Sequence, residues 1–431
     1  MVTQLRSDRV ADEWGFVVRG LRVVGTRGRI AVCGAVVLFA SVFAVASPAD
    51  ARVIGHANRP GSAGPGPAVA GTVSVSPTSI TFPTQRAGTF SGVAKTITVT
   101  NTGSVAVVIS DIFSATNDYF GSTTCFAHPS LAIGASCTIT IYFLPTASGT
   151  RADALKIEDD ATGSPQTVTL SGKGVEGYYL VGARGGVAHF GDAVPHGDAT
   201  AIGLKAPIIS IRTTGNGDGY WLLGSDGGIF SYGNAAFHGS TGGIRLNQPV
   251  VGMERTVSGK GYWLVAKDGG IFSFGDAAFY GSTGAMRLNQ PVVGMARTPT
   301  GKGYWLVARD GGIFSFGDAK FFGSTGNIRL NQPITGMVAR PTANGYWMHA
   351  SDGGIFAFGD APFFGSAAGT GGTTTGMAAT PDGAGYWLVS NTGAVHHYGN
   401  APSLGDLPSA GIAASDVVGI APTSPPLDFL F

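Results

Sequence analysis

The stretch GYWLVARDGGIFSFGDA at residues 303–319 is the most informative pattern in this chain, and it returns with a single change at residues 261–277. Its opening Gly-Tyr-Trp occurs four times at a spacing of 42 residues, with an outlying later copy and an earlier Gly-Tyr-Tyr variant. These tripeptides begin at Gly177, Gly219, Gly261, Gly303, Gly345 and Gly385. The C-terminal half of the chain is therefore an array of six repeats.

Each repeat divides into four short apolar runs, which in one repeat are residues 292–295, 303–308, 312–317 and 320–324. The runs are rich in aromatic and β-branched side chains, and Pro-Thr-Gly, Asp-Gly-Gly and Gly-Asp turns bound them. None has a helical apolar period. A four-stranded unit of about 40 residues predicts the blade of a β-propeller.

The two ends of the array complement each other. The first repeat begins at Gly177 with no apolar run before it, whereas the chain closes with a run from Val417 and no Gly-Tyr-Trp after it. We therefore predict a closed six-bladed propeller over residues 177–424, in which the last strand completes the first blade and removes the exposed edges. Residues 425–431 remain as a tail. The six first-strand runs begin at Ile208, Val250, Val292, Ile334, Thr374 and Val417.

The N-terminus carries an export signal. Four arginines precede a mostly apolar run from Ile30 to Ala46, and the small residues Ala49 and Ala51 follow. This pattern predicts a secretory signal peptide over residues 1–51, with an uncleaved membrane anchor as the alternative. We expect contact with a membrane only if this segment stays uncleaved and acts as an anchor. The Pro-, Gly- and Ala-rich residues 52–71 are expected to form a flexible linker.

Residues 72–174 contain alternating strand-like runs that predict an immunoglobulin-like β-sandwich of about seven strands. Cys125 and Cys137 are an even pair in an exported chain, so we expect a disulfide, with two buried thiols as the alternative. The runs are residues 79–82, 95–100, 105–109, 137–143 and 166–170.

Two resemblances accompany these patterns. Asn101-Thr102-Gly103, Cys125, the stretch 131–137, Phe143-Leu144-Pro145 and residues 170–174 together resemble the choice-of-anchor D modules, which are immunoglobulin-like. The GYWLVA-x-DGGIF-x-FGDA repeat resembles an array in secreted proteins of high-GC Gram-positive bacteria. These resemblances imply export and work at the cell surface or outside the cell, and they imply no catalytic residue.

The composition argues against nucleic-acid binding. Charged residues make up 12% of the chain and the formal net charge is +1, so no basic field attracts a polyanion. The 69 glycines in 431 residues are about twice the usual share and belong to turns.

Most acidic residues repeat with the blades, which favours turns over an active site. One series precedes Gly-Gly, where Asp suits a tight hairpin, and a second series is expected to bond its own backbone. Neither has enough oxygen ligands for calcium, and we expect no metal or cofactor. The first series is Asp226, Asp268, Asp310 and Asp352, and the second is Asp192, Asn234, Asp276, Asp318, Asp360 and Asn400.

Two kinds of side chain are candidates for ligand binding. The tryptophans of the second strand are expected to pack between blades, and stacking on a sugar is the alternative. The histidines break the repeat: His189 and His397 share one column, and His196 and His238 share another. Near the ring seam they could form a metal or acidic-ligand site, and sequence drift is the alternative. The tryptophans are Trp221, Trp263, Trp305, Trp347 and Trp387, with Tyr179 in the sixth position.

We therefore expect a secreted or cell-surface binding or adhesion protein whose propeller recognises a glycan or another envelope component. No catalytic constellation is apparent, so an enzyme is not the favoured interpretation. A sialidase- or glycosidase-like hydrolase would depend on a carboxylate pair. A structural envelope protein with a protein partner is the other alternative. The acids outside the turn series include Glu254 and Asp416, and also Asp198 and Asp406, which share one repeat column in the first and sixth units.

Overall fold

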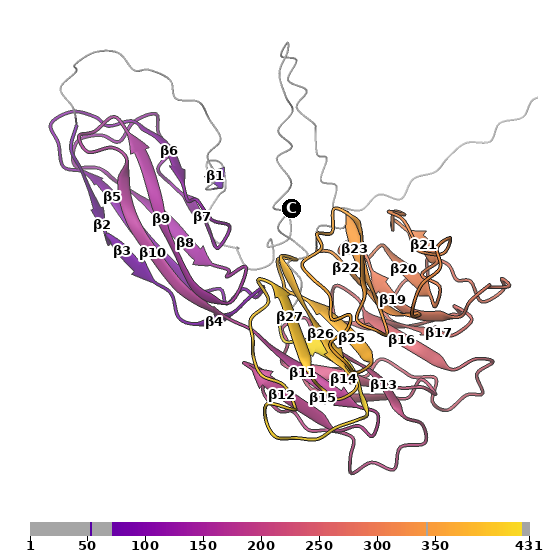
Figure 1. Ribbon diagram of the computed structural model, residues 1–431. Helices are drawn as coiled ribbons and strands as arrows, with labels where there is room; N and C mark the ends of the chain where they lie inside the picture. Colours follow the sequence, from indigo (N-terminus) through magenta and orange to yellow (C-terminus); the bar gives the residue numbers. More distant parts are fainter. Residues whose placement is uncertain (1–51, 54–70, 342–343, 425–431) are drawn as a thin grey trace, which may run out of the picture. The chain divides into compact units, whose positions relative to one another are not determined.

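A computed structural model describes residues 52–53, 71–341 and 344–424 of the chain (Figure 1). These residues form two five-stranded sheets followed by six three-stranded sheets. Within this part of the chain, no helix is long and apolar enough to cross a membrane. The predicted signal peptide, most of the predicted linker and the predicted tail lie outside the described residues.

The two five-stranded sheets form the predicted sandwich, with ten strands where about seven were expected, because three short strands of two or three residues add to the longer ones. Along β8 buried side chains alternate with more exposed ones, because successive side chains of a strand point to opposite faces. The core between the sheets includes Ile97, Ile139, Leu155 and Val168, all at most 1% exposed. The first sheet has the order β1 (Arg52–Val53), β7 (Tyr119–Thr123), β8 (Ser136–Phe143), β5 (Ala94–Asn101) and β2 (Val73–Ser76). The second has β3 (Ser79–Thr81), β10 (Gln166–Val175), β9 (Gly149–Asp159) and β6 (Ile109–Phe113), with β4 (Gln85–Arg86) also paired to β10.

Two predictions for this region were wrong. Arg52 and Val53, expected in the linker, pair with Thr123 and Ser122 of β7. The run 105–109, expected as a strand, is a loop until β6 begins at its last residue. Within this loop Val107 forms an isolated antiparallel bridge with Leu131. The buried Asn101 amide holds the same region by donating to the carbonyl oxygens of Val105, at 2.8 Å, and Leu131, at 2.9 Å.

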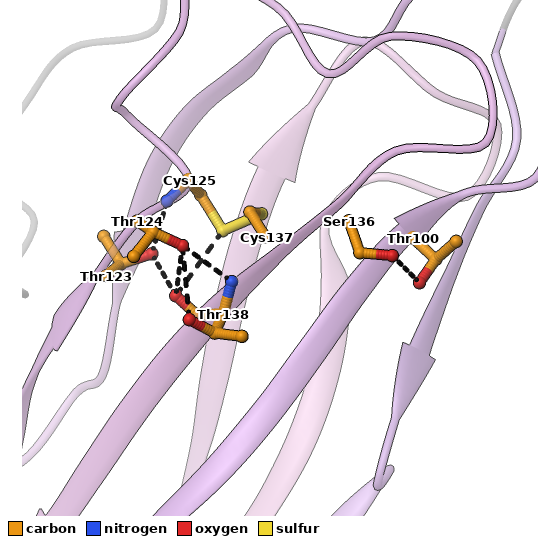
Figure 2. Close-up of a disulfide and its surroundings, with 7 residues drawn as sticks. All are labelled: Thr100, Thr123, Thr124, Cys125, Ser136, Cys137 and Thr138. Carbon is orange, nitrogen blue, oxygen red and sulfur yellow. Dashed lines mark hydrogen bonds between the residues drawn. A yellow bond between two sulfur atoms is a disulfide. The ribbon is translucent and has the colours of Figure 1, made fainter.

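The disulfide between Cys125 and Cys137 is present, with a Cα–Cα distance of 4.9 Å (Figure 2). It ties β8 to the segment that follows β7. Beside it, the backbone N–H of Thr138 donates to the Thr124 hydroxyl at 2.9 Å. The expected pairing is confirmed, and the alternative of two free thiols is not.

The six three-stranded sheets are the propeller blades. The first combines β12 (Val187–Gly191), β11 (Gly177–Gly182) and β28 (Val417–Pro422). The others are continuous in sequence: β13 (Ile208–Thr213), β14 (Gly219–Gly224) and β15 (Ile229–Gly233); β16 (Val250–Arg255), β17 (Gly261–Ala266) and β18 (Ile271–Gly275); β19 (Val292–Arg297), β20 (Gly303–Ala308) and β21 (Ile313–Gly317); β22 (Ile334–Ala339), β23 (Gly345–Ala350) and β24 (Ile355–Gly359); β25 (Thr374–Ala379), β26 (Gly385–Ser390) and β27 (Val395–Gly399).

Ring closure occurs as predicted. β28 pairs antiparallel with β11, placing Ala421 opposite Tyr179 and Ile420 opposite Leu180. In Figure 1 the yellow C-terminal strands accordingly lie beside β11 and β12. β28 also packs against β13 of the second blade and β25 of the sixth. The inner strands β13, β16, β19, β22, β25 and β28 therefore surround a central axis.

The prediction of four strands per blade was wrong, since each blade has three. The fourth run, residues 320–324 in one blade, is a loop. Its Gly323 has a φ of 136°, a conformation that strands do not use. The loop backbone is held instead by the Tyr346 hydroxyl of the next blade, which accepts from the Phe322 N–H and donates to the Gly323 carbonyl oxygen.

Candidate functional site

The tyrosine of each Gly-Tyr-Trp joins neighbouring blades. The Tyr304 hydroxyl, on the fourth blade, accepts from the Tyr280 N–H at 3.1 Å and donates to the Gly281 carbonyl oxygen at 2.7 Å. Its ring is fully buried, and this burial raises the pKa of its hydroxyl. The same pair of bonds recurs at Tyr262, Tyr346 and Tyr386.

The tryptophans fix the same loops from inside their own blade. Each indole N–H donates to the backbone carbonyl oxygen 15 residues later, for example Trp263 to Ala278 at 2.7 Å. All five rings are at most 1% exposed, and they pack against the tyrosine of the next blade, as Trp263 does against Tyr304. The alternative of direct sugar stacking by these rings is contradicted by their burial. Tyr179 makes the equivalent bond to the Val194 carbonyl oxygen in the first blade, at 2.8 Å. The other bonds run from Trp221, Trp305, Trp347 and Trp387.

These two sets of bonds flank one exposed phenylalanine in each of four consecutive blades. In the third blade, Ala278 is held by Trp263, Tyr280 is held by Tyr304, and Phe279 lies between them. Its side chain is 62% exposed although both sequence neighbours are anchored. Phe237, Phe321 and Phe363 occupy the same position and are 60–61% exposed. Pro195 and Ser403 replace the phenylalanine in the first and sixth blades.

This phenylalanine column was not predicted as a site from the sequence; the candidate residues His196 and His238 belong to the column that follows it. The available signal was the recurrence of Phe one residue before that column in four repeats. The repeat spacing alone could not show which phenylalanine side chains are exposed to solvent. The preceding strand also carries phenylalanines at regular spacing, such as Phe274 and Phe316, and these are partly buried.

Two of the candidate histidines have packing roles. The His196 ring lies 5.9 Å from Tyr220 and the His238 ring 5.5 Å from Tyr262, each on the following blade. A His238 ring nitrogen also lies 3.3 Å from the Gly259 carbonyl oxygen. The residue at this repeat position therefore packs against the tyrosine ring of the next blade, as Tyr280 of the third blade packs against Tyr304.

The other two histidines are exposed on outer strands. His189 lies on β12 opposite Tyr179, and His397 lies on β27 opposite Trp387. Among the residues that the structure describes, no group of three His, Cys, Asp or Glu could hold a metal ion. The four histidines are thus not assembled into the conceivable metal site.

The repeated acids serve as turns, with one correction. Asp226 accepts the Gly228 N–H at 2.9 Å, and the rest of that series does the same. The second series was expected to bond its own backbone. Five of its six members instead accept hydroxyl donors from the turn after the inner strand, as Asp318 does from Thr298 at 2.8 Å, whereas Asp360 pairs with Arg340.

The acids of the hydrolase alternative each have a local partner. Glu254 pairs with Arg212 at 3.1 Å, and Asp416 lies 3.7 Å from Arg184. A glycosidase general acid needs a raised pKa. Hydrogen bonds from Thr200 lower the pKa of Asp198. For Asp406, burial acts to raise the pKa, but bonds from Ser409 and Val395 outweigh it and the pKa is lowered.

No protein-family model and no curated protein matches the chain. A structural-genomics protein of unknown function from Bacteroides thetaiotaomicron VPI-5482 is similar at 13% identity and TM-score 0.41, over 83% of this chain and 94% of that one. The β-propeller domain of Myceliophteria thermophila Cps50 (Swd1) is similar at 10% identity and TM-score 0.31, over 45% and 65%. A protein of unknown function from Porphyromonas gingivalis W83 is similar at 12% identity and TM-score 0.21. That match covers 24% of this chain and 47%, about half, of the other protein. All three similarities are weak and concern the fold alone.

Proposed function

We propose that this chain is a secreted or cell-surface binding protein whose propeller recognises a glycan of the cell envelope. The observation that carries the proposal is the column of four exposed phenylalanines, each held between two anchored residues. Phe237, Phe279, Phe321 and Phe363 present flat apolar faces to solvent at the same place in successive blades.

Single exposed apolar residues are ordinary on a protein surface, but four phenylalanines at one position of successive blades are a regular feature that a ligand could use. A phenyl face can cover the apolar C–H face of a sugar ring. One such contact is weak, but four at regular intervals suit a polymer whose own units repeat, because linked contacts multiply in avidity. A repeated protein surface and a repeated polysaccharide are therefore matched partners.

The loops that carry these rings are held by hydrogen bonds on both sides of each phenylalanine. The carbonyl before each phenylalanine accepts from a buried indole, and the N–H after it donates to a buried tyrosine. Binding then loses less conformational entropy than it would on a free loop. The two buried aromatic columns thus support recognition indirectly, by positioning the exposed one.

Export is the second part of the proposal. The disulfide is consistent with an extracellular protein, since such bonds persist in oxidising compartments. The basic and apolar N-terminal sequence and the resemblance to choice-of-anchor D modules and to secreted repeat arrays support the same location. We therefore place the function outside the cell or on its surface.

The test is binding of the chain from Arg52 onward to a panel of purified bacterial wall polysaccharides. Replacing all four phenylalanines with alanine should weaken binding by about 10²-fold, the scale of lost avidity. The control is Ile133→Ala in the sandwich, where an equally exposed apolar residue, 63% accessible, is removed outside the column.

Two results would contradict the proposal. Wild-type protein that binds no polysaccharide removes the glycan, and a quadruple variant that binds as wild type removes the phenylalanine column. Release of reducing sugar ends during the assay would instead favour the hydrolase alternative.

A further inference from the structure

One end of the central axis opens into a cavity of about 130 Å³. Residues from all six inner strands line it, at the ends where those strands turn outward. The sixth side of the wall comes from Ile420 and Pro422 of β28, so the cavity exists only because the ring closes. Water takes about 30 Å³ per molecule, so the space holds a group of a few heavy atoms.

The wall of this cavity is strongly basic. Four arginines and one glutamate line it, which gives a formal charge of +4 − 1 = +3. Arginine stays protonated at every physiological pH. In a chain whose net charge is +1, this is a local concentration of positive charge. The arginines are Arg212, Arg255, Arg297 and Arg340, and the acid is Glu254.

The structure holds these guanidinium groups in place. Arg255 and Arg297 are each 7% exposed, and their Nη1 atoms donate to the carbonyl oxygens of Thr256, at 3.2 Å, and Thr298, at 3.0 Å. Arg212 pairs with Glu254, and Arg340 bonds Asp360 at 2.8 Å just outside the wall. Side chains positioned in this way can bind an anion without a large loss of rotamer entropy.

The arginines break the repeat, so blade architecture does not require them. Arg255 and Arg297 end their inner strands, where the equivalent residues of the other four blades are Thr213, Ala339, Ala379 and Pro422. Arg340 stands where the other five blades have a threonine, whose hydroxyl in four of them donates to the acid or amide of the second turn series. Four consecutive blades thus direct one arginine each to the same end of the axis.

We infer that this cavity binds a phosphate group. The four arginines enter from four consecutive blades and can meet an anion from several sides, which suits a tetrahedral oxyanion more than a planar carboxylate. The guanidinium fork matches phosphate oxygens with paired hydrogen bonds. The volume admits the phosphate itself while the rest of a larger molecule stays outside. The group could belong to a free phosphomonoester or to a phosphodiester polymer.

Calorimetric titration of the purified protein tests this, with inorganic phosphate, glycerol 3-phosphate and a polyglycerol phosphate as probes at constant ionic strength. Arg212→Gln and Arg297→Gln should each weaken phosphate binding about tenfold or more, the effect of losing a hydrogen bond to a charged group. Glu254→Gln should tighten it, because a repelling charge is removed. Arg184→Gln, whose side chain is 90% exposed, should change nothing.

The outcomes separate clearly. Tight binding of the monoesters assigns a free phosphate ligand, whereas preference for the polymer assigns a phosphodiester, and both support the site. The phosphate site would be overturned if no probe bound, or if acetate bound equally well. It would also be overturned if the arginine variants and Glu254→Gln left phosphate binding unaltered. Because Glu254→Gln predicts a gain, a failure of an arginine variant to fold leaves the test intact. The phenylalanine variants should keep phosphate binding, so this inference and the glycan proposal can fail independently.

Discussion

His349 should make the propeller unstable in acid. It lies on β23 at a position where other blades carry Val or Leu, and it is 3% exposed. Its ring faces Gly336 of the inner strand, where a methyl group would come within 2.5 Å of Nε2. Nδ1 lies 2.9 Å from the Thr335 hydroxyl. Burial lowers the pKa of His349 from 6.5 to about 4.

The size of the effect follows from that difference. Between pH 6.5 and 4 the unfolded chain binds a proton that the folded chain does not, so the free energy of unfolding falls as the pH falls. Each pKa unit is worth about 1.4 kcal/mol, and 6.5 − 4 = 2.5 units give a loss of about 3 kcal/mol. Above pH 7 the imidazole is neutral in both states and has no pH-dependent effect.

Urea denaturation followed by tryptophan fluorescence measures this, because the tryptophans among the described residues all lie in the propeller. His349→Val installs the residue that the third and fourth blades carry. The difference in unfolding free energy between wild type and this variant should be constant above pH 7 and shift by about 3 kcal/mol in the variant's favour by pH 4. His397→Ser, at an exposed position, is the control. A difference for His349→Val that does not vary with pH would contradict a lowered pKa for His349 in the folded protein.

Three further outcomes are expected. Tyr304→Phe should lower the unfolding free energy measured in urea titration by about 2–4 kcal/mol, because a buried N–H and a buried carbonyl both lose a partner. Tyr280→Phe is the control: it loses one hydrogen bond of 3.0 Å and should lower the unfolding free energy by about 1 kcal/mol. Gly281→Ala should lower the melting temperature, since φ is 137° and the new methyl would meet Phe316 at 2.4 Å; an unchanged value would contradict the loop conformation. Replacing Cys125 and Cys137 with alanine should destabilise the sandwich by about 3 kcal/mol, the scale for a loop this short, and calorimetry should show the propeller transition unmoved.

Much of the fold could be predicted because it is encoded locally. A 42-residue period, Asp-Gly-Gly turns and complementary ends were enough for the number of blades and for closure by the strand from Val417. The fourth run was mistaken for a strand because its composition matches one. Its backbone groups are taken by a tyrosine hydroxyl of the next blade, a contact that no local pattern records.

The candidate site shows the same division more sharply. Which residues repeat, and which depart from the repeat, can be seen in the amino-acid sequence alone. That Trp263 is buried while Phe279, in the same repeat, is exposed follows from the packing of the blades, because burial depends on side chains contributed by the adjacent blade. Likewise, Arg212 and Arg340 are 128 residues apart in sequence and line one cavity only after the ring has closed. Period is a property of near neighbours along the chain, whereas exposure and convergence are properties of neighbours in space.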